Sequence, residues 1–255
     1  MDPMTAILAQ QPYRCRLDWG RDGVRRAALR RDIVVVVDVL RFSTATVAAV
    51  GHGALIYPCA PSDDAGILAR CVGAEVAADH LDTAAPHPYS LSPASYDRVP
   101  PGTRVVLPSP NGAACARAAH DAPYVFVGAL VNAQAVGAAV STLMAETDLS
   151  ATIIACGEQW LVPGEDGGLR VAVEDYLGAG AILSFVQFDK SPEACVCEAS
   201  FGATRDHLED LVWESISGRE LRYKGRGADI ERAVQINLSQ TVPILRQERL
   251  ESFHP

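Results

Sequence analysis

A run of five β-branched residues, Ile33 to Val37, constrains the fold of this chain most strongly. Such a run predicts a strand that is buried on both faces, as in the centre of a parallel sheet. The next seven residues include Asp38, Arg41, Ser43 and Thr44. Ligands of open α/β sheets bind beyond the carboxyl ends of the strands. We therefore expect a functional site directly after this strand.

Short apolar runs alternate with alanine-rich stretches along most of the chain. They predict strands at 54–57, 75–78, 104–107, 124–127 and 151–155, and helices at 43–50, 61–70, 112–120, 132–145 and 169–187. This alternation indicates parallel β-α-β units, and therefore an α/β fold with a layered, mostly parallel sheet flanked by helices. Residues 79–103 interrupt the pattern with a long irregular loop, a feature that is more often functional than not.

The last part of the chain, from about residue 190, has a more charged composition. Helices are expected there at 208–216 and 228–238. We predict that residues 190–255 form a C-terminal helical subregion that packs on the sheet, so that residues 1–255 are a single domain.

The charge of the chain limits its partners. Of its 255 residues 49% are hydrophobic, and its net charge is −9 with a pI of about 5.1. Nucleic-acid and membrane-surface binding rely on a basic patch, so we expect neither. A small anionic substrate would need local arginines, backbone amides or a metal ion to offset the negative charge.

Cysteine usage and the termini indicate a cellular compartment. The seven cysteines are odd in number and include no Cys-x-x-Cys pair, which favours reduced, mostly buried thiols in a cytoplasmic protein. Met1 to Gln11 lacks the basic and apolar regions of a signal peptide. No apolar run approaches the roughly 18 residues of a membrane span.

Three other predicted strands are followed by small polar residues, as Asp38 follows the first. The segments are Ser109 to Gly112, Gly128 to Asn132 and Cys156 to Glu158. If the strands are parallel neighbours, these segments meet Asp38 on one rim of the sheet. The Asn111-Gly112 step could present free N–H groups and a helix dipole to an anion, or it could simply cap a helix.

Four established phosphate-binding or phosphatase motifs are absent. Leu40 stands where a haloacid-dehalogenase phosphatase has its second aspartate, and Val162 stands where a tyrosine phosphatase with Cys156 as nucleophile would have arginine. There is no Walker loop. Gly178-Ala-Gly180 lacks a third glycine and lies within a predicted helix, so it is not a dinucleotide-binding fingerprint.

Glu174 and Asp175 could bind a metal ion together with Asp38. Mg²⁺ prefers a few carboxylates, completed by waters and substrate oxygens. Adjacent residues of a helix point about 100° apart, so we expect one of these two acids to face the core and the other to face solvent. The alternative is that both belong to a solvated acidic face.

Arg41 and Cys156 each allow two interpretations. Arg41 could bind a substrate carboxylate or phosphate by a bidentate pair, or it could form a structural ion pair with Asp38. Cys156 could be a nucleophile, but no neighbouring basic residue would activate its thiol, and a small packed thiol fits the pattern as well.

Several segments together resemble the 2-phosphosulfolactate phosphatase family, over about residues 33–240. The matching segments are Asp38 to Thr44, Asn111-Gly112, Gly128 to Ala133, Cys156-Gly157 and Val173 to Gly180. The resemblance implies an α/β fold of its own type, Mg²⁺-dependent hydrolysis of phosphate esters of 2-hydroxy acids in coenzyme M biosynthesis, and a homodimer.

The chain departs from the family pattern at positions that could hold substrate. Ser109, Pro110 and Ala113 stand where the family usually has threonines. The segment Ser90 to Tyr96 lacks the usual Gly-Asn and Glu-Tyr pairs, and Cys156-Gly157-Glu158 replaces the commoner Cys-Ala-Gly. The scaffold and metal chemistry therefore carry over better than the identity of the substrate.

These observations predict a Mg²⁺-assisted phosphatase, such as one that converts 2-phosphosulfolactate to sulfolactate. The expected residues are Asp38, Arg41 and Cys156 as catalytic, Asp38 with Glu174 or Asp175 as metal ligands, and Ser43, Thr44, Asn111, Gly112 and Asn132 as substrate-binding. The sequence does not decide whether water or Asp38 itself attacks the phosphorus atom. A binding protein that kept the fold but does not catalyse, and a metal-independent hydrolase that uses Cys156, are the alternatives.

Overall fold

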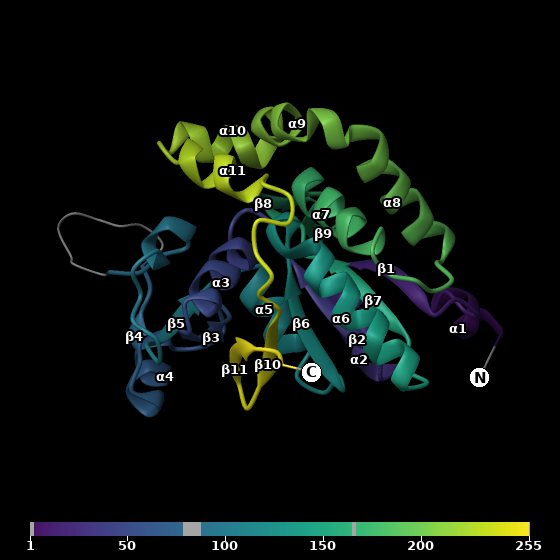
Figure 1. Ribbon diagram of the computed structural model, residues 1–255, viewed down its shortest axis with the longest axis horizontal. Coiled ribbons are helices and arrows are strands. Elements are labelled where there is room, and N and C mark those ends of the chain that lie inside the picture. The colour runs from purple at the N-terminus through teal and green to yellow at the C-terminus, as the bar shows by residue number, and fades with distance from the viewer. Residues whose placement is uncertain (1–2, 79–87, 165–166, 255) are drawn as a thin grey trace.

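The computed structural model describes residues 3–78, 88–164 and 167–254, whose main feature is a nine-stranded sheet of order β1-β7-β2-β6-β10-β11-β3-β5-β4 (Figure 1). Within the groups β1-β7-β2-β6 and β3-β5-β4 neighbouring strands are parallel. The antiparallel β10–β11 hairpin joins the two groups. The strands are β1 (Cys15–Trp19), β2 (Ile33–Val37), β3 (Leu55–Cys59), β4 (Glu75–Val76), β5 (Arg104–Pro108), β6 (Tyr124–Gly128), β7 (Ala151–Ala155), β10 (Pro243–Arg246) and β11 (Arg249–Ser252). The predicted α/β fold with a mostly parallel sheet is confirmed.

Helices cover both faces of this sheet (Figure 1). Those before residue 190 are α1 (Pro3–Leu8), α2 (Gly20–Leu29), α3 (Phe42–Gly51), α4 (Ala65–Val72), α5 (Gly112–Ala118), α6 (Ala133–Glu146) and α7 (Val173–Leu183). Those after it are α8 (Pro192–Thr204), α9 (Leu208–Glu214), α10 (Ile216–Tyr223) and α11 (Gly227–Ala233). Among the described residues, no helix has the length and apolar character needed to cross a membrane.

Strand β2 lies at the centre of the parallel part, as its β-branched run predicts. All five of its residues are fully buried, and they pair in register with β6 and with β7. Val34 and Val36 join a core with α2, α3 and α5, whereas Ile33, Val35 and Val37 join a core with α6, α7 and α8. Both faces of the strand are therefore covered.

The C-terminal region is only partly the predicted helical subregion. Helices α8 to α11 form an arch above the sheet, from the side of β1 to the side of α3 (Figure 1), but residues 243–252 form strands β10 and β11 within the sheet. The turn between them places Gln247 and Glu248 at positive φ, of 47° and 68°. Hairpin turns of this kind usually carry Asn-Gly or Asp-Gly, so the sequence lacked the usual signal for this hairpin.

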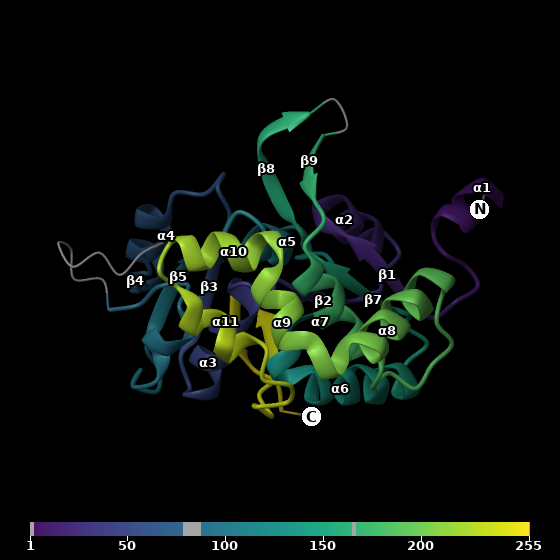
Figure 2. The same ribbon diagram turned by 90° about the horizontal axis from the view of Figure 1, so that it is seen from above.

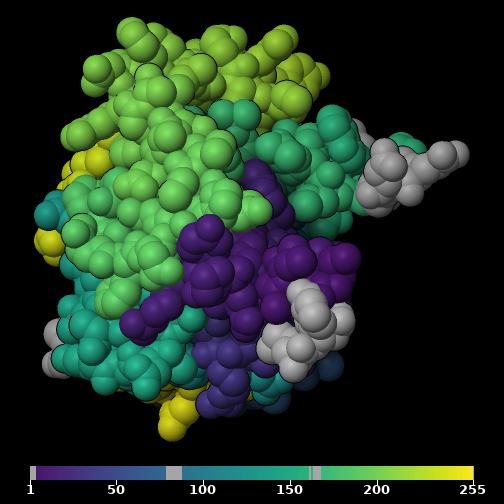
Figure 3. All heavy atoms as spheres, turned by 90° about the vertical axis from the view of Figure 1, so that its right-hand side faces the viewer, coloured from purple at the N-terminus to yellow at the C-terminus, as the bar shows by residue number. Residues whose placement is uncertain are grey.

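Further differences from the predicted pattern include helices α1, α2, α8 and α10, which were not expected, and two strand regions. Strand β1 was not expected, because Arg16 and Asp18 interrupt its apolar character; Arg16 is buried there through an ion pair with Asp32 at 3.0 Å. The helix expected at 169–187 begins at Val173, since Gly167–Arg170 is strand β9 of a separate hairpin with β8 (Glu158–Gly164). This hairpin stands out from the body of the molecule, as Figure 2 shows from above and Figure 3 from the side.

The long loop expected at 79–103 is described only from residue 88 onward. The predicted loop residues 79–87 lie outside the described residues, and so do Glu165 and Asp166, where the neighbouring glycines favour a turn. The described part contains a short 3-10 turn, Pro93–Tyr96. Tyr96 is fully buried and stacks on Tyr89 with ring centroids 5.4 Å apart, so this part of the segment packs on the core.

Helix α7 contains two glycines because two neighbours approach it closely. A Cβ at Gly178 would lie 2.6 Å from Val39 Cγ2, and a Cβ at Gly180 would overlap the Cys197 carbonyl oxygen and lie 2.9 Å from Phe201 Cβ. Gly178 therefore lets α7 reach the carboxyl end of β2, and Gly180 lets α8 pack on α7. The glycine pair serves helix packing.

We expect Gly180→Ala to destabilise the protein by about 1–3 kcal/mol, because the added methyl group overpacks the contact between α7 and α8. Gly202→Ala in helix α8 is the matched control. A Cβ there has no neighbour within 4 Å, and replacing a helical glycine stabilises by roughly 0.5–1 kcal/mol. Urea unfolding of both variants measures the difference. Equal stability of the two would contradict the close packing of α7 on α8.

Candidate active site

Asp38 is buried directly after β2 and is held by two backbone N–H groups. Its Oδ2 accepts a hydrogen bond from Gly112 N at 2.8 Å, and its Oδ1 accepts one from Phe42 N at 3.2 Å. The Ser109 hydroxyl lies 3.4 Å from Oδ2. These contacts join the start of α3 to the loop between β5 and α5. They fix the carboxylate at the carboxyl end of the strand, as the sequence predicts.

Gly112 supports Asp38 and does not offer its N–H group to a ligand. A side chain at this position would overlap the ring of Phe42, and its Cβ would lie 2.7 Å from Asp38 Oδ2. The neighbouring Asn111 donates from Nδ2 to Glu158 Oε1 at 2.7 Å. Glu158 follows β7 by three residues, so the polar ends of β2, β5 and β7 do meet at one rim.

Glu174 and Asp175 are both buried at the start of α7, with exposed fractions of 2% and 3%. The prediction that one of them faces solvent is wrong, and so is the alternative of a solvated acidic face. The amino-terminal turn of α7 inserts below the loops that follow β2 and β7. Asp175 Oδ1 accepts from Val39 N at 2.7 Å, and its Oδ2 accepts from Gly157 N at 2.9 Å.

Burial sets the protonation of these acids. Loss of hydration, together with the nearby charge of Glu158, raises the pKa of Asp38 to about 6 against the hydrogen bond from Gly112. Burial also raises the pKa of Asp175 well above its ordinary value. The pKa of Glu174 is raised by burial too, although the Ser217 hydroxyl and Arg170 lower it. Acids with raised pKa values gathered in a cleft are typical of functional sites.

A cavity of about 590 Å³ opens above Asp38. We call it the Asp38 cavity; its polar lining includes Asp38, Arg41, Ser109, Asn111, Glu158, Arg170, Ser217 and Lys224. The lining comes from the ends of β2, β3 and β5, from the β8–β9 hairpin and from α10. The wall carries three cationic side chains but also four acidic ones, which include Asp63 and Glu220. An anion would therefore have to bind beside an arginine, because the cavity as a whole is not positively charged.

Arg41 forms a buried ion pair, and its partner is Asp229. Arg41 Nη1 lies 3.0 Å from Asp229 Oδ2, and the Ser92 hydroxyl donates to Asp229 Oδ1 at 2.5 Å. The structural ion pair between Arg41 and Asp38 is therefore replaced by one that ties Arg41 to α11. Since Arg41 also lines the Asp38 cavity, Asp229 positions it there.

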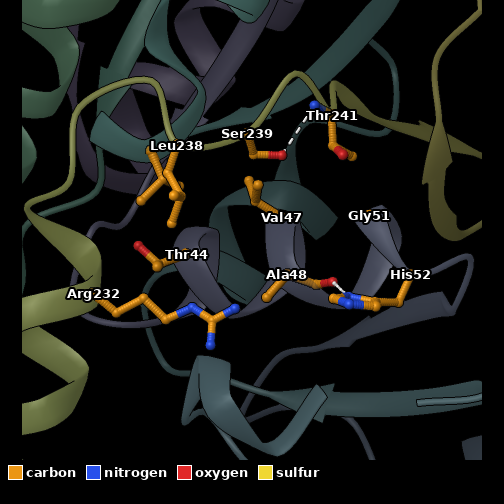
Figure 4. A pocket seen from close by; sticks show the side chains of 10 residues that line it. Thr44, Val47, Ala48, Gly51, His52, Arg232, Leu238, Ser239 and Thr241 are labelled. Carbon is orange, nitrogen blue, oxygen red and sulfur yellow. Dashed lines mark hydrogen bonds between the residues drawn. The ribbon is translucent and has the colours of Figure 1, made fainter. Parts of the chain in front are cut away.

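Three of the predicted substrate-binding residues lie away from this cavity. Ser43 Oγ accepts from Asp38 N and donates to Val36 O, and fully buried Asn132 bonds to backbone groups of Val127, Ala129 and Thr241. Thr44 donates to Val39 O and lines a different cavity of about 220 Å³, between α3 and the 238–241 segment (Figure 4). These three side chains form hydrogen bonds that hold backbone groups in place. Asn111, in contrast, lines the Asp38 cavity as predicted for a substrate-binding residue.

Cys156 is a packed thiol. It is 2% exposed, and burial raises its pKa well above the ordinary value, with the Cys115 thiol and the charge of Asp38 acting in the same direction. The thiolate is the nucleophilic form of cysteine, and this environment suppresses it. The geometry therefore does not support a cysteine nucleophile.

Two residues of the site, Arg170 and Asp229, have no counterpart in the sequence prediction. Glu158 lies in a segment that the sequence places on the rim with Asp38, although no role is predicted for it. Arg170 ends strand β9, which was read as helix. Asp229 carries no sequence signal, because it reaches Arg41 from a distant part of the chain.

The acidic side chains around Asp38 are the candidate ligands for Mg²⁺. Within the described residues, no group of three His, Cys, Asp or Glu side chains is arranged to hold a metal ion. Mg²⁺ usually takes only one or two carboxylates and completes its shell with water and phosphate oxygens. Glu174 Oε2 is buried without a hydrogen-bond partner. A buried carboxylate oxygen that accepts no hydrogen bond is stabilised when a cation binds to it. The residues therefore fit a magnesium ion.

Comparison with known proteins identifies the family. A family model described as 2-phosphosulpholactate phosphatase matches residues 22–248. The chain belongs to this family. It is 28% identical over 215 residues to a probable 2-phosphosulfolactate phosphatase of Carboxydothermus hydrogenoformans, covering 82% of this chain and 84% of that protein.

Relatives from archaea agree with this assignment to the 2-phosphosulpholactate phosphatase family. The 2-phosphosulfolactate phosphatase of Methanothermobacter thermautotrophicus is 27% identical over 221 residues, covering 86% of this chain and 89% of the relative. That of Methanocaldococcus jannaschii is 22% identical, covering 86% and 91%. The resemblance inferred from the sequence is confirmed. The predicted enzyme class, a phosphoric monoester hydrolase, is the class that these names describe.

We expect Glu174→Gln to stabilise the metal-free protein at pH 8. A carboxyl whose pKa is raised by folding contributes stability below its unfolded pKa and loses it as pH rises through the folded pKa. Glutamine has no charge to lose. In the presence of a chelator the gain in Tm should be about 2–4 °C, or roughly 1 kcal/mol, at pH 8 and should vanish near pH 4. Exposed Glu146→Gln is the control and should change Tm at neither pH.

Proposed function

We propose that the protein is a Mg²⁺-dependent phosphatase that hydrolyses the phosphate monoester of a 2-hydroxy acid, such as 2-phosphosulfolactate. The observation that carries the proposal is the unpartnered, buried Glu174 oxygen near Asp38, in a chain whose cavity wall contains arginines. Membership of the 2-phosphosulpholactate phosphatase family and the names of its relatives support the substrate class.

Asp38 and Glu174 are the best candidates for the metal ligands. Asp175 is not among the residues that line the Asp38 cavity, and both of its oxygens accept backbone N–H groups, so it positions the loops that follow β2 and β7. Asp38 does line the cavity, and Glu174 has a buried oxygen without a hydrogen-bond partner. When bound, Mg²⁺ polarises phosphoryl oxygens and lowers the pKa of a water. Asp38 is held at both oxygens by backbone donors, which supports the role of a fixed ligand over that of a nucleophile.

The phosphate end of the substrate would lie beside Asp38 and Arg41. Arg41 offers a cation that Asp229 keeps in place, and Ser109 offers a hydroxyl in the cavity wall. Positioned charges of this kind stabilise the negative charge that moves onto oxygen during phosphoryl transfer. Ser109, in place of the family's threonine, keeps a hydroxyl group near Asp38.

A homodimer and a cytoplasmic location are part of the same proposal. The seven cysteines are all unpaired, which agrees with a reducing compartment. Apolar side chains on the β8–β9 hairpin and on the segment that follows it, such as Trp160, Val162 and Val171, are exposed in the single chain. Association of two chains would remove such side chains from water.

Phosphate release from a panel of phosphate monoesters measures the proposed activity. We expect turnover of 2-phosphosulfolactate with Mg²⁺, none with chelator, and a loss of about 10²–10³-fold in Asp38→Asn, the range for removing one charge-stabilising group. Asp22→Asn, at an exposed position of α2, is the control. Cys156→Ser should keep activity within about threefold. Tight binding of the esters without turnover would instead establish a protein that does not catalyse.

Magnesium affinity should depend on pH through Asp38. Protons compete with the metal for a carboxylate, and the pKa of Asp38 in the metal-free protein is about 6. Mg²⁺ should therefore raise Tm at pH 7.5, and should raise it less as pH falls below about 6. Asp38→Asn should abolish the shift at both pH values. A shift that is independent of pH, or that survives in Asp38→Asn, would place the metal elsewhere.

A further inference from the structure

Arg170 differs from the other buried arginines of the described residues. Arg16, Arg41 and Arg170 are all less than 10% exposed. Arg16 lies 3.0 Å from Asp32, and Arg41 lies 3.0 Å from Asp229. A buried guanidinium normally needs such a partner, because removal from water costs more than an isolated charge recovers.

The direct contacts of Arg170 are long, although buried Glu174 lies close enough for Arg170 to lower its pKa. Its Nη2 lies 3.9 Å from Glu220 Oε2, and its hydrogen bond to Ser217 Oγ is 3.4 Å long. Glu220 is already paired with Lys224, whose Nζ lies 2.6 Å from Oε1. A guanidinium has five N–H donors. Arg170 also lines the Asp38 cavity, so a ligand bound there would lie within reach of its guanidinium.

The surroundings of Arg170 hold it in place. Its guanidinium carbon lies 5.7 Å from the centre of the Trp160 ring, on the neighbouring strand of the β8–β9 hairpin. Stacking on an aromatic ring orients the guanidinium plane, and the low exposure of Arg170 limits competition from water. A planar set of fixed donors of this kind fits the oxygens of a carboxylate or a sulfonate.

We propose that Arg170 is a specificity-determining residue, which binds the acid group of the substrate that lies away from its phosphate. The inference rests on the proposed function, and it says which substrate group binds on the Arg170 side of the Asp38 cavity. The Asp38 side would hold the phosphate, and Arg170, beside Ser217 of α10, would hold a carboxylate or a sulfonate. A phosphate ester without such a group would leave Arg170 with only its long contacts to Ser217 and Glu220.

Two esters that differ in one acid group provide the test. 2-Phospholactate and isopropyl phosphate differ only in a carboxylate that replaces a methyl group. In Arg170→Met we expect KM for 2-phospholactate to rise about 10- to 100-fold, as for the loss of a hydrogen bond to a charged group, with kcat within about threefold. The kinetics of isopropyl phosphate should not change. Arg170→Lys should recover part of the loss.

A matched control uses Arg222 of α10, which stacks on Trp213 and pairs with Glu214 outside the Asp38 cavity. Arg222→Met should leave both esters unaffected. If Arg170→Met instead lowers kcat equally for both esters, Arg170 acts through Ser217 and Glu174, and the inference is wrong. An effect on 2-phosphosulfolactate but not on 2-phospholactate would assign the sulfonate to Arg170.

Calorimetric binding of sulfolactate separates this inference from the proposed function. Wild-type protein should bind sulfolactate, and Arg170→Met should weaken binding by the same 10- to 100-fold. If no ester is hydrolysed but Arg170→Met still binds sulfolactate more weakly than wild type does, the phosphatase proposal is wrong and the anion site at Arg170 is supported. If the folded wild-type protein hydrolyses both esters but does not bind sulfolactate, or binds it as tightly as Arg170→Met does, the anion site is refuted.

Discussion

The hydrogen bond from Gly112 N to the buried carboxylate of Asp38 is the contact on which the rest of the site depends. It joins the two groups of parallel strands, because Asp38 follows β2 and Gly112 begins α5 after β5. It also requires glycine at position 112, where a Cβ would meet Asp38 Oδ2 and the ring of Phe42. A carboxylate removed from water needs such donors. The bond therefore positions the strand ends and the charge together.

The site gathers negative charge in a chain that is already acidic. The charges of Asp38 and Glu174 both raise the pKa of Asp175, and Glu174 also raises that of Asp38. Glu158 raises the pKa of Asp38 and of Glu174. Backbone donors satisfy Asp38 and Asp175, but Glu174 keeps an oxygen without a partner. Such an arrangement costs stability unless a cation shares it. This loss of stability is the physical argument for a bound divalent ion, and it follows from contacts within this chain.

The sequence predicts the elements whose signal is local and misses those that depend on distant partners. The run Ile33 to Val37 fixes β2, and Ala151–Ala155 is the predicted strand residue for residue, because buried parallel strands carry unbroken apolar runs. Strands β1, β10 and β11 carry charges and are stabilised by pairing, so no local pattern reveals them. Within the site, Asp38 and Asn111 were found at strand ends. The partner of Arg41 was not found, because Asp229 approaches from the helices that arch over the sheet.

The cavity divides into two parts that are carried by different segments. Asp38, Ser109 and Asn111 lie directly after strands of the sheet, so a change there alters the fold as well as the chemistry. Arg170 and Ser217 belong to the projecting hairpin and to the arch of helices. Segments of that kind tolerate substitution better than strand ends in a packed core. Relatives only 22–28% identical can therefore keep one reaction while the acid group that they recognise changes. The substrate of a given member is accordingly to be sought in the hairpin and in α10, more than in Asp38 and its neighbours.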